Sequence, residues 1–212
     1  MIYPDIKLEE KLWKQGFKVV VGIDEAGRGP LAGPVAAGAV VITPDTKIIG
    51  TVRDSKKMTR KRREEAFDLI KESVWGWGIG LVTAEEIDDF GIQYAVCKAM
   101  SIALKGVEEM IGSKVDYIIV DGLNVELIDD YPTMKIKEGD LYHYSIACGS
   151  VLAKVERDRL MMEYATVYPE YGFETNMGYG TKKHMKAMER YGICDIHRRS
   201  YKPVAKYVLE GI

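Results

Sequence analysis

The segment VVVGIDEAGRGP, residues 19–30, joins an apolar run to two adjacent acids and a glycine-rich turn. The β-branched run is typical of a buried strand, and the glycines and proline after it indicate a turn. A charge at the edge of a core costs free energy unless a partner or a cation neutralises it. Asp24 and Glu25 are therefore candidate functional residues, because the first basic residue after them is Arg28.

The composition indicates one globular domain. A chain of 212 residues with 47% hydrophobic residues can fill a full core, and no linker divides it, so we expect a single domain over residues 1–212. The net charge of −2 does not indicate a nucleic-acid-binding protein, so such a function must rest on local basic clusters. The three cysteines form no CxxC pair, which argues against a zinc site or a disulfide framework. Since we find neither a signal peptide nor a membrane-spanning run, we expect a cytoplasmic protein.

Periodicity predicts the secondary structure. Apolar and alternating patterns predict strands over residues 18–23, 35–42, 75–81 and 116–121. In WGWGIGL (75–81) every second residue is glycine, which indicates that another backbone packs closely on that face. Helical spacing predicts helices over residues 59–72, 83–110 with a break at Gly91, 145–166, and a shorter one from Thr181. This order predicts a mixed sheet flanked by helices, followed by a helical C-terminal part.

Further acids follow other predicted elements. Asp121 ends the fourth strand, and Asp140 precedes the helix that begins near Ser145. By themselves they also fit a turn-forming aspartate and a helix-entry acid, respectively. Clustered carboxylates repel one another unless a cation lies between them, and Mg²⁺ and Mn²⁺ prefer oxygen ligands. Two such ions can activate a water and stabilise the leaving oxygen in phosphodiester cleavage.

The turn and the basic clusters each allow two interpretations. GRGPLAG (27–33) is neither a Walker A loop nor a dinucleotide fingerprint, so its glycines serve either simple turn chemistry or close approach of a sugar-phosphate. The basic residues of 53–63 and 197–202 form either a solvated face or phosphate contacts. Tyr179, in NMGYGTKKH, either packs on the core or stacks on a sugar or base.

Seven segments, in this order, resemble the ribonuclease HII family, the type 2 ribonucleases H. They are GIDEAGRGPLAGPV (22–35), DSKK (54–57), VDG (120–122), EGD (138–140), SIACGSVLAKVERDR (145–159), GYGTKKH (178–184) and IHRRSY (196–201). No single segment is specific, but the combination is, and it extends over nearly the whole chain. The resemblance implies an α/β fold: a ribonuclease H-like mixed five-stranded sheet flanked by helices, with a C-terminal helical part.

The resemblance also implies an activity. It implies an endonuclease that cleaves the RNA strand of RNA–DNA hybrids and nicks duplex DNA 5′ of embedded ribonucleotides, leaving a 3′-hydroxyl and a 5′-phosphate. We expect it to act as a monomer that uses Mg²⁺ or Mn²⁺, two ions per site. The implied metal-site carboxylates are Asp24, Glu25, Asp121 and Asp140.

The remaining implied residues contact the nucleic acid. The backbone of Gly27, Arg28 and Gly29 would contact the ribose 2′-hydroxyl, the group that distinguishes RNA from DNA. Tyr179 would stack at the junction between ribonucleotide and deoxyribonucleotide. The implied phosphate contacts are Lys56, Lys154, Arg198 and Ser200.

Two places depart from the family pattern. Met177 stands where members often carry a basic residue, and Cys148-Gly149 stands where alanine-like residues are usual. Asp158 is a further acid, but two arginines flank it and Lys154 lies one helical turn before it, which favours a structural ion pair. Two other functions stay open here: a DNA nuclease of the same broad fold, and a catalytically silent hybrid-binding module.

Overall fold

The computed structural model of the protein describes residues 3–53, 55, 58–122 and 131–210. The strands within these ranges are β1 (Val20–Ala26), β2 (Val35–Val41), β3 (Gly76–Val82), β4 (Tyr117–Asp121) and β5 (Thr133–Ile136). The helices are α1 (Lys7–Lys14), α2 (Arg60–Ser73), α3 (Ala84–Phe90), α4 (Ile92–Ile111), α5 (Gly139–Tyr142), α6 (Tyr144–Val167), the 3₁₀ helix η2 (Pro169–Tyr171), α7 (Phe173–Asn176), α8 (Lys182–Tyr191) and α9 (Lys202–Glu210).

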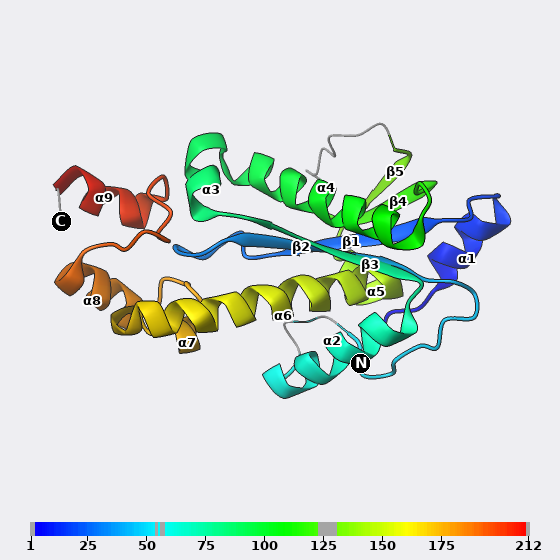
Figure 1. Cartoon of the computed structure of the whole chain (residues 1–212), viewed down its shortest axis with the longest axis horizontal. Helices are drawn as coiled ribbons and strands as arrows, with labels where there is room; N and C mark the ends of the chain where they lie inside the picture. The colour runs from blue at the N-terminus through cyan, green and yellow to red at the C-terminus, as the bar shows by residue number, and fades with distance from the viewer. Residues whose placement is uncertain (1–2, 54, 56–57, 123–130, 211–212) are drawn as a thin grey trace.

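The strands form one mixed sheet in the order β3-β2-β1-β4-β5 (Figure 1). β1 runs antiparallel to β2, as the predicted hairpin requires, and β2 runs antiparallel to β3. β4 runs parallel to β1, and β5 runs parallel to β4. The five-stranded sheet implied by the resemblance is therefore confirmed, whereas the residue patterns by themselves predicted only the first four strands.

The α4 helix packs against one face of the sheet because β3 presents a bare face to it (Figure 1). A Cβ added at Gly78 would meet the carbonyl oxygen of Ala103, and one at Gly80 would meet that of Ala99. These contacts confirm the close approach that the alternating glycines predicted. Trp77 and Ile79 pack instead against the core on the other side of the sheet.

The long α6 helix lies on the opposite face and is equally close (Figure 1). A Cβ at Gly38 of β2 would meet the carbonyl oxygen of Gly149, and a Cβ at Gly149 would lie 2.5 Å from the carbonyl oxygen of Gly38. The small residue at position 149 is thus a requirement of this helix–strand contact. The contact brings Ser150, one residue further along α6, close to the carboxyl end of β1.

The predicted helix boundaries agree with the structure. Thr59 accepts a hydrogen bond from the amide of Arg62 at the start of α2, and Thr83 accepts one from the amide of Glu86 at the start of α3. Gly91, at φ +84°, separates α3 from α4 as expected. The α1 helix was not predicted; its buried Glu9 accepts hydrogen bonds from Ser145 and so caps the start of α6.

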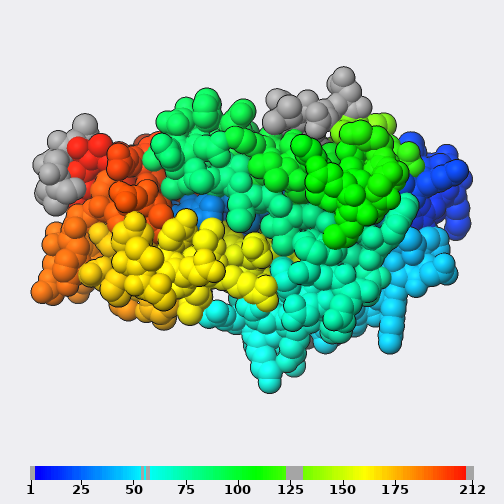
Figure 2. Space-filling model, in the orientation of Figure 1, coloured from blue at the N-terminus to red at the C-terminus, as the bar shows by residue number. Residues whose placement is uncertain are grey.

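The C-terminal helices lie beyond one end of the sheet, far from α1 (Figure 1). Their core contains Tyr171, Phe173, Met188 and Val204, packed against Met161 of α6. The space-filling view shows only a small blue part of the first strands between the helices, so the sheet is covered on this side (Figure 2). Within the described ranges, no helix has the length and apolar character needed to cross a bilayer.

Candidate active site

Three aspartates meet at one edge of the sheet. β1 and β4 are parallel with Ile23 opposite Val120, so Asp24 and Asp121 follow as neighbours at the carboxyl ends of adjacent strands. Asp140, at the start of α5, completes the group. In the described part of the chain, one carboxylate oxygen from each of the three lies within 4.8 Å of the others. Asp24 and Asp140 are each only 4% exposed.

The loop before α5 is oriented by Asp121 itself. The amide of Gly139 donates a hydrogen bond of 2.9 Å to Oδ1 of Asp121. Glu138 adopts a left-handed conformation, at φ +56°, which turns the chain from β5 into α5. Asp140 therefore reaches the site through backbone geometry that depends on the neighbouring strand.

The charges of this group repel one another. Burial raises the pKa of Asp24 well above its usual range, and the nearby carboxylates of Glu25 and Asp121 raise it further. A hydrogen bond with Ser150 acts in the opposite direction, because it favours the charged form. Buried carboxylates in such proximity need a counter-charge, and an all-oxygen donor set fits a hard divalent cation such as Mg²⁺ or Mn²⁺.

Glu25 takes a different position. Its carboxylate lies 3.5 Å from the guanidinium of Arg28. Consecutive strand residues alternate between faces, which explains why Glu25 is not among the three residues whose ligand atoms converge. It remains near enough to affect the pKa of Asp24, and its role as a metal ligand stays a prediction.

A cavity of about 170 Å³ lies beside Glu25, the residue that follows Asp24. It is lined by Glu25, Ala26, Gly27, Arg28, Gly29, Ser55, Lys154 and Tyr179. Tyr179 is 47% exposed, and a Cβ at Gly29 would lie 3.7 Å from its ring. The structure thus brings together the glycine turn, the aromatic residue and one of the predicted basic residues, although Gly29 and Tyr179 are 150 positions apart in the sequence.

Comparison with known proteins identifies the family and supports the fold. The sequence model of one family, described as Ribonuclease HII, matches residues 21–204. The chain belongs to the ribonuclease HII family. A ribonuclease HII of Caldanaerobacter subterraneus subsp. tengcongensis is 46% identical over 198 residues, which cover 91% of this chain and 78% of that protein. A ribonuclease HII of Clostridioides difficile is 48% identical over 193 residues, covering 91% of this chain and 73% of that protein.

The solved structures agree. The ribonuclease H2 of Pyrococcus horikoshii OT3 superposes with a TM-score of 0.74 at 26% identity, covering 91% of this chain and 98% of that one. The ribonuclease HII chain is thus a metal-dependent endoribonuclease, and the predicted family, fold class and enzyme class are confirmed. The three aspartates have the donor atoms and spacing of a divalent-metal site, as this chemistry requires.

Two buried arginines, Arg157 and Arg198, donate hydrogen bonds to backbone carbonyls of the glycine turn. Arg157 of α6 donates from Nε to the carbonyl oxygen of Pro34 (2.8 Å) and from Nη2 to that of Ala32 (3.1 Å). Its Nη1 donates to the carbonyl oxygen of Met177 (3.0 Å), which lies just before the Tyr179 loop. Arg157 was missed in the sequence, although its place four residues before the buried Met161 puts it on the inner face of the helix.

The ion pair predicted for Asp158 is present. Nζ of Lys154 lies 2.6 Å from one carboxylate oxygen of Asp158, and Nη2 of Arg63 lies 3.4 Å from the other. Lys154 also lines the cavity, and burial lowers the pKa of its ammonium group. Asp158 thus has a structural role, while Lys154 remains a candidate phosphate contact.

The other predicted phosphate contacts are placed differently. Arg198 is fully buried and donates to backbone carbonyls, so in this structure it lies behind the turn instead of on the surface. Ser200 is exposed, and its hydroxyl donates to Asp88 of α3 over 2.6 Å. Lys56 lies outside the described residues.

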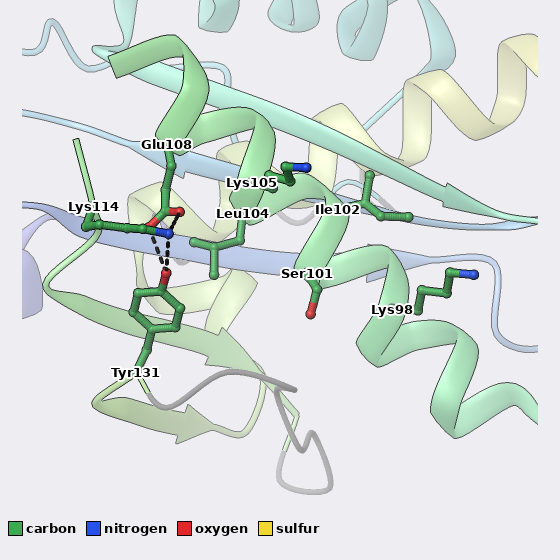
Figure 3. Close-up of a pocket in the computed structure, with 8 residues that line it drawn as sticks. All are labelled: Lys98, Ser101, Ile102, Leu104, Lys105, Glu108, Lys114 and Tyr131. Atoms are coloured by element: carbon green, nitrogen blue, oxygen red, sulfur yellow. Dashed lines mark hydrogen bonds and ion pairs between the residues drawn. The ribbon is translucent and has the colours of Figure 1, made fainter. Parts of the chain in front are cut away.

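A larger cavity, of about 410 Å³, lies elsewhere (Figure 3). Side chains of α4 line it together with Lys114 and Tyr131, and none of the predicted site residues is among them. Glu108 accepts hydrogen bonds from Lys114 (2.7 Å) and from the Tyr131 hydroxyl (2.8 Å), so the charge of Lys114 is neutralised locally. Cavity size therefore does not mark the site here, whereas the converging carboxylates do.

Proposed function

We propose that this enzyme cleaves the RNA strand of RNA–DNA hybrids and nicks duplex DNA on the 5′ side of an embedded ribonucleotide. The products are a 3′-hydroxyl and a 5′-phosphate. The observation that carries this proposal is that β1 joins the two features: Asp24 belongs to the aspartate group, and the next residue, Glu25, lines the cavity formed by the glycine turn and Tyr179. A ribonucleotide in that cavity would lie beside the carboxylates that hydrolysis needs.

The proposed cofactor is Mg²⁺ or Mn²⁺, with two ions per site. Asp24, Asp121 and Asp140 would hold the ions, with Glu25 as a fourth carboxylate at the rim of the cavity. When bound, such ions activate a water and stabilise the leaving oxygen. The chain itself contributes the fixed geometry, since Gly139 ties Asp121 to the loop of Asp140.

Recognition of the ribonucleotide is proposed for the turn and Tyr179. The side chain of Arg28 donates to Gln93 of α4 over 2.9 Å, and Gly27 and Gly29, which have no side chain, offer only backbone atoms to the cavity that they line. Backbone amides of Gly27, Arg28 and Gly29 can then contact a 2′-hydroxyl, which acts as both donor and acceptor. The exposed ring of Tyr179 offers a surface on which a sugar or base can stack.

Phosphate contacts are proposed for Lys154, Lys56 and Ser200. Because the net charge is −2, they must act locally, and the basic start of α2 lies near Lys154 through their shared contact with Asp158. Since one chain supplies all elements of the site, we propose that the enzyme acts as a monomer with a single catalytic domain, and that it is cytoplasmic.

A duplex series tests this function. The substrates are one duplex sequence with zero, one or four consecutive ribonucleotides, incubated with Mg²⁺, with Mn²⁺ and with chelator. We expect cuts only in the ribonucleotide-containing strands, only with metal, and 5′ of the ribonucleotide. Asp68→Asn, which removes an exposed acid of α2, is the matched control for Asp121→Asn and should keep full activity. Equal cleavage of the all-DNA duplex would overturn the proposal in favour of a DNA nuclease.

A further inference from the structure

Arg198 contacts the turn through four backbone carbonyls. Its Nη2 donates to the carbonyl oxygen of Gly27 (2.6 Å) and of Pro34 (3.0 Å), its Nη1 to that of Arg28 (2.9 Å), and its Nε to that of Gly33 (3.0 Å). The side chain is fully buried. A buried guanidinium without water needs such oxygens around it, so the carbonyls and the cation fix one another.

The hydroxyl of Tyr201 strengthens the same contact. It donates to the carbonyl oxygen of Arg28 over 2.7 Å and accepts from Nη1 of Arg198 over 3.0 Å. Arg198 is itself held in place, because its amide donates to the carbonyl oxygen of Leu31 and the next two residues donate to Asp88. The segment that carries Arg198 is therefore anchored to Asp88 of α3 as well as to the turn that it holds.

Because peptide bonds are planar, these carbonyl contacts also fix the directions in which the amides of Arg28 and Gly29 point. Every described peptide bond is trans, and in a trans peptide the C=O and the following N–H point in opposite directions. Since the carbonyl of Gly27 points to Arg198, the amide of Arg28 points away from it. Since the carbonyl of Arg28 points to Arg198 and Tyr201, the amide of Gly29 points away from both. Arg28 and Gly29 both line the cavity, whereas the buried Arg198 does not.

We propose that Arg198, together with the hydroxyl of Tyr201, is a positioning residue that aims the amides of Arg28 and Gly29 into the cavity and thereby sets the preference for ribose over deoxyribose. The inference rests on the proposed function, in which the turn contacts the 2′-hydroxyl. It gives Arg198 a role different from the predicted phosphate contact. A lysine at this position has one ammonium group, which cannot reach four carbonyls in the fork geometry of a guanidinium.

Tyr201→Phe is the decisive variant, because it removes one hydroxyl and leaves the ring. Tyr171→Phe is its matched control: Tyr171 belongs to the same C-terminal core, against which Tyr201 packs, but its hydroxyl donates to Gly192 and not to the turn. Both are made in an Asp121→Asn background, so that binding is measured without cleavage. The quantity is the ratio of the Kd for an all-DNA duplex to the Kd for the same duplex with one ribonucleotide.

We expect Tyr201→Phe to lower this ratio about fivefold, the effect of one neutral hydrogen bond, with an unchanged Kd for the all-DNA duplex. Tyr171→Phe should keep the ratio of the parent. Arg198→Lys, if folded by circular dichroism, should lower the ratio further. The inference is overturned if Tyr201→Phe keeps the parental ratio, or if it weakens binding of both duplexes equally, as a general loss of structure would. A parent without any ribonucleotide preference refutes the proposed contact with the 2′-hydroxyl, a failure visible before any variant is compared.

Discussion

Nε2 of His184 and Nε2 of His197 lie 3.0 Å apart in the core of the C-terminal part. The amide of Cys194 donates to Nδ1 of His197 over 3.0 Å, so this nitrogen accepts and Nε2 of His197 carries the proton. His184 then accepts at Nε2, and its Nδ1 donates to the carbonyl oxygen of Tyr179 over 3.0 Å. This hydrogen-bond pattern assigns both rings as neutral and connects Cys194 to the loop of Tyr179.

Because the histidine pair is buried and neutral, we expect the stability of the fold to decrease at acidic pH. Burial, and then the neighbouring His184, lower the pKa of His197 to about 4, whereas an unfolded histidine titrates near 6.5. Between these values the unfolded chain binds a proton that the native state does not, so the free energy of unfolding falls as the pH is lowered from 6.5 to 4. The expected loss is up to about 3 kcal/mol. Urea unfolding at pH 7, 5.5 and 4.5 measures it, and His197→Gln should flatten the slope; equal slopes would contradict the assignment.

Asp24→Asn separates catalysis from stability. Burial, and then Glu25 and Asp121, disfavour the charge of Asp24, so its removal should raise the free energy of unfolding in chelator. Nicking of a single-ribonucleotide duplex should fall at least about 100-fold. Mg²⁺ should raise the Tm of the unmodified enzyme more than that of the variant. A variant that is less stable in chelator, or that nicks normally, would refute this account of the site.

Gly38→Ala tests the contact between β2 and α6. The added Cβ would meet the backbone carbonyl of Gly149, which cannot move without shifting the helix. We expect the free energy of unfolding to drop by about 3 kcal/mol, as for an overpacked core. Gly50→Ala is the control, because a Cβ there meets no atom within 4 Å, and it should change the stability by less than about 0.5 kcal/mol. Similar effects of the two variants would mean that the helix is not held at this distance.

Two substitutions of Tyr179 should distinguish the effect on KM of losing the ring from that of losing the hydroxyl. If the exposed ring stacks on substrate, Tyr179→Ala should raise KM for the single-ribonucleotide duplex by about 5–100-fold, the range of base–aromatic stacking. Tyr179→Phe keeps the ring and should stay within about twofold of the unmodified enzyme. Equal losses in both variants would instead assign the effect to the hydroxyl.

Local patterns were sufficient for most elements of the fold. The threonine caps at Thr59 and Thr83 and the alternating glycines of β3 each depend on neighbours in sequence, and the structure confirms them. β5 was not found from its residues because it is a four-residue edge strand without a buried apolar run. Edge strands of this kind are specified by pairing with a neighbour, here β4.

The sequence by itself determined the family, the strands that carry Asp24 and Asp121, and the glycine turn between β1 and β2, because these features are encoded in short, local motifs. The tertiary structure decided which side chains work together. The sequence placed Arg198 in a basic cluster, whereas in the structure it is buried and donates to a carbonyl of the turn. The structure also shows that His184 connects His197 to Tyr179 through hydrogen bonds. The physical reason is that hydrogen-bond partners of buried polar groups are set by what folding brings within about 3 Å, and sequence spacing does not contain that information.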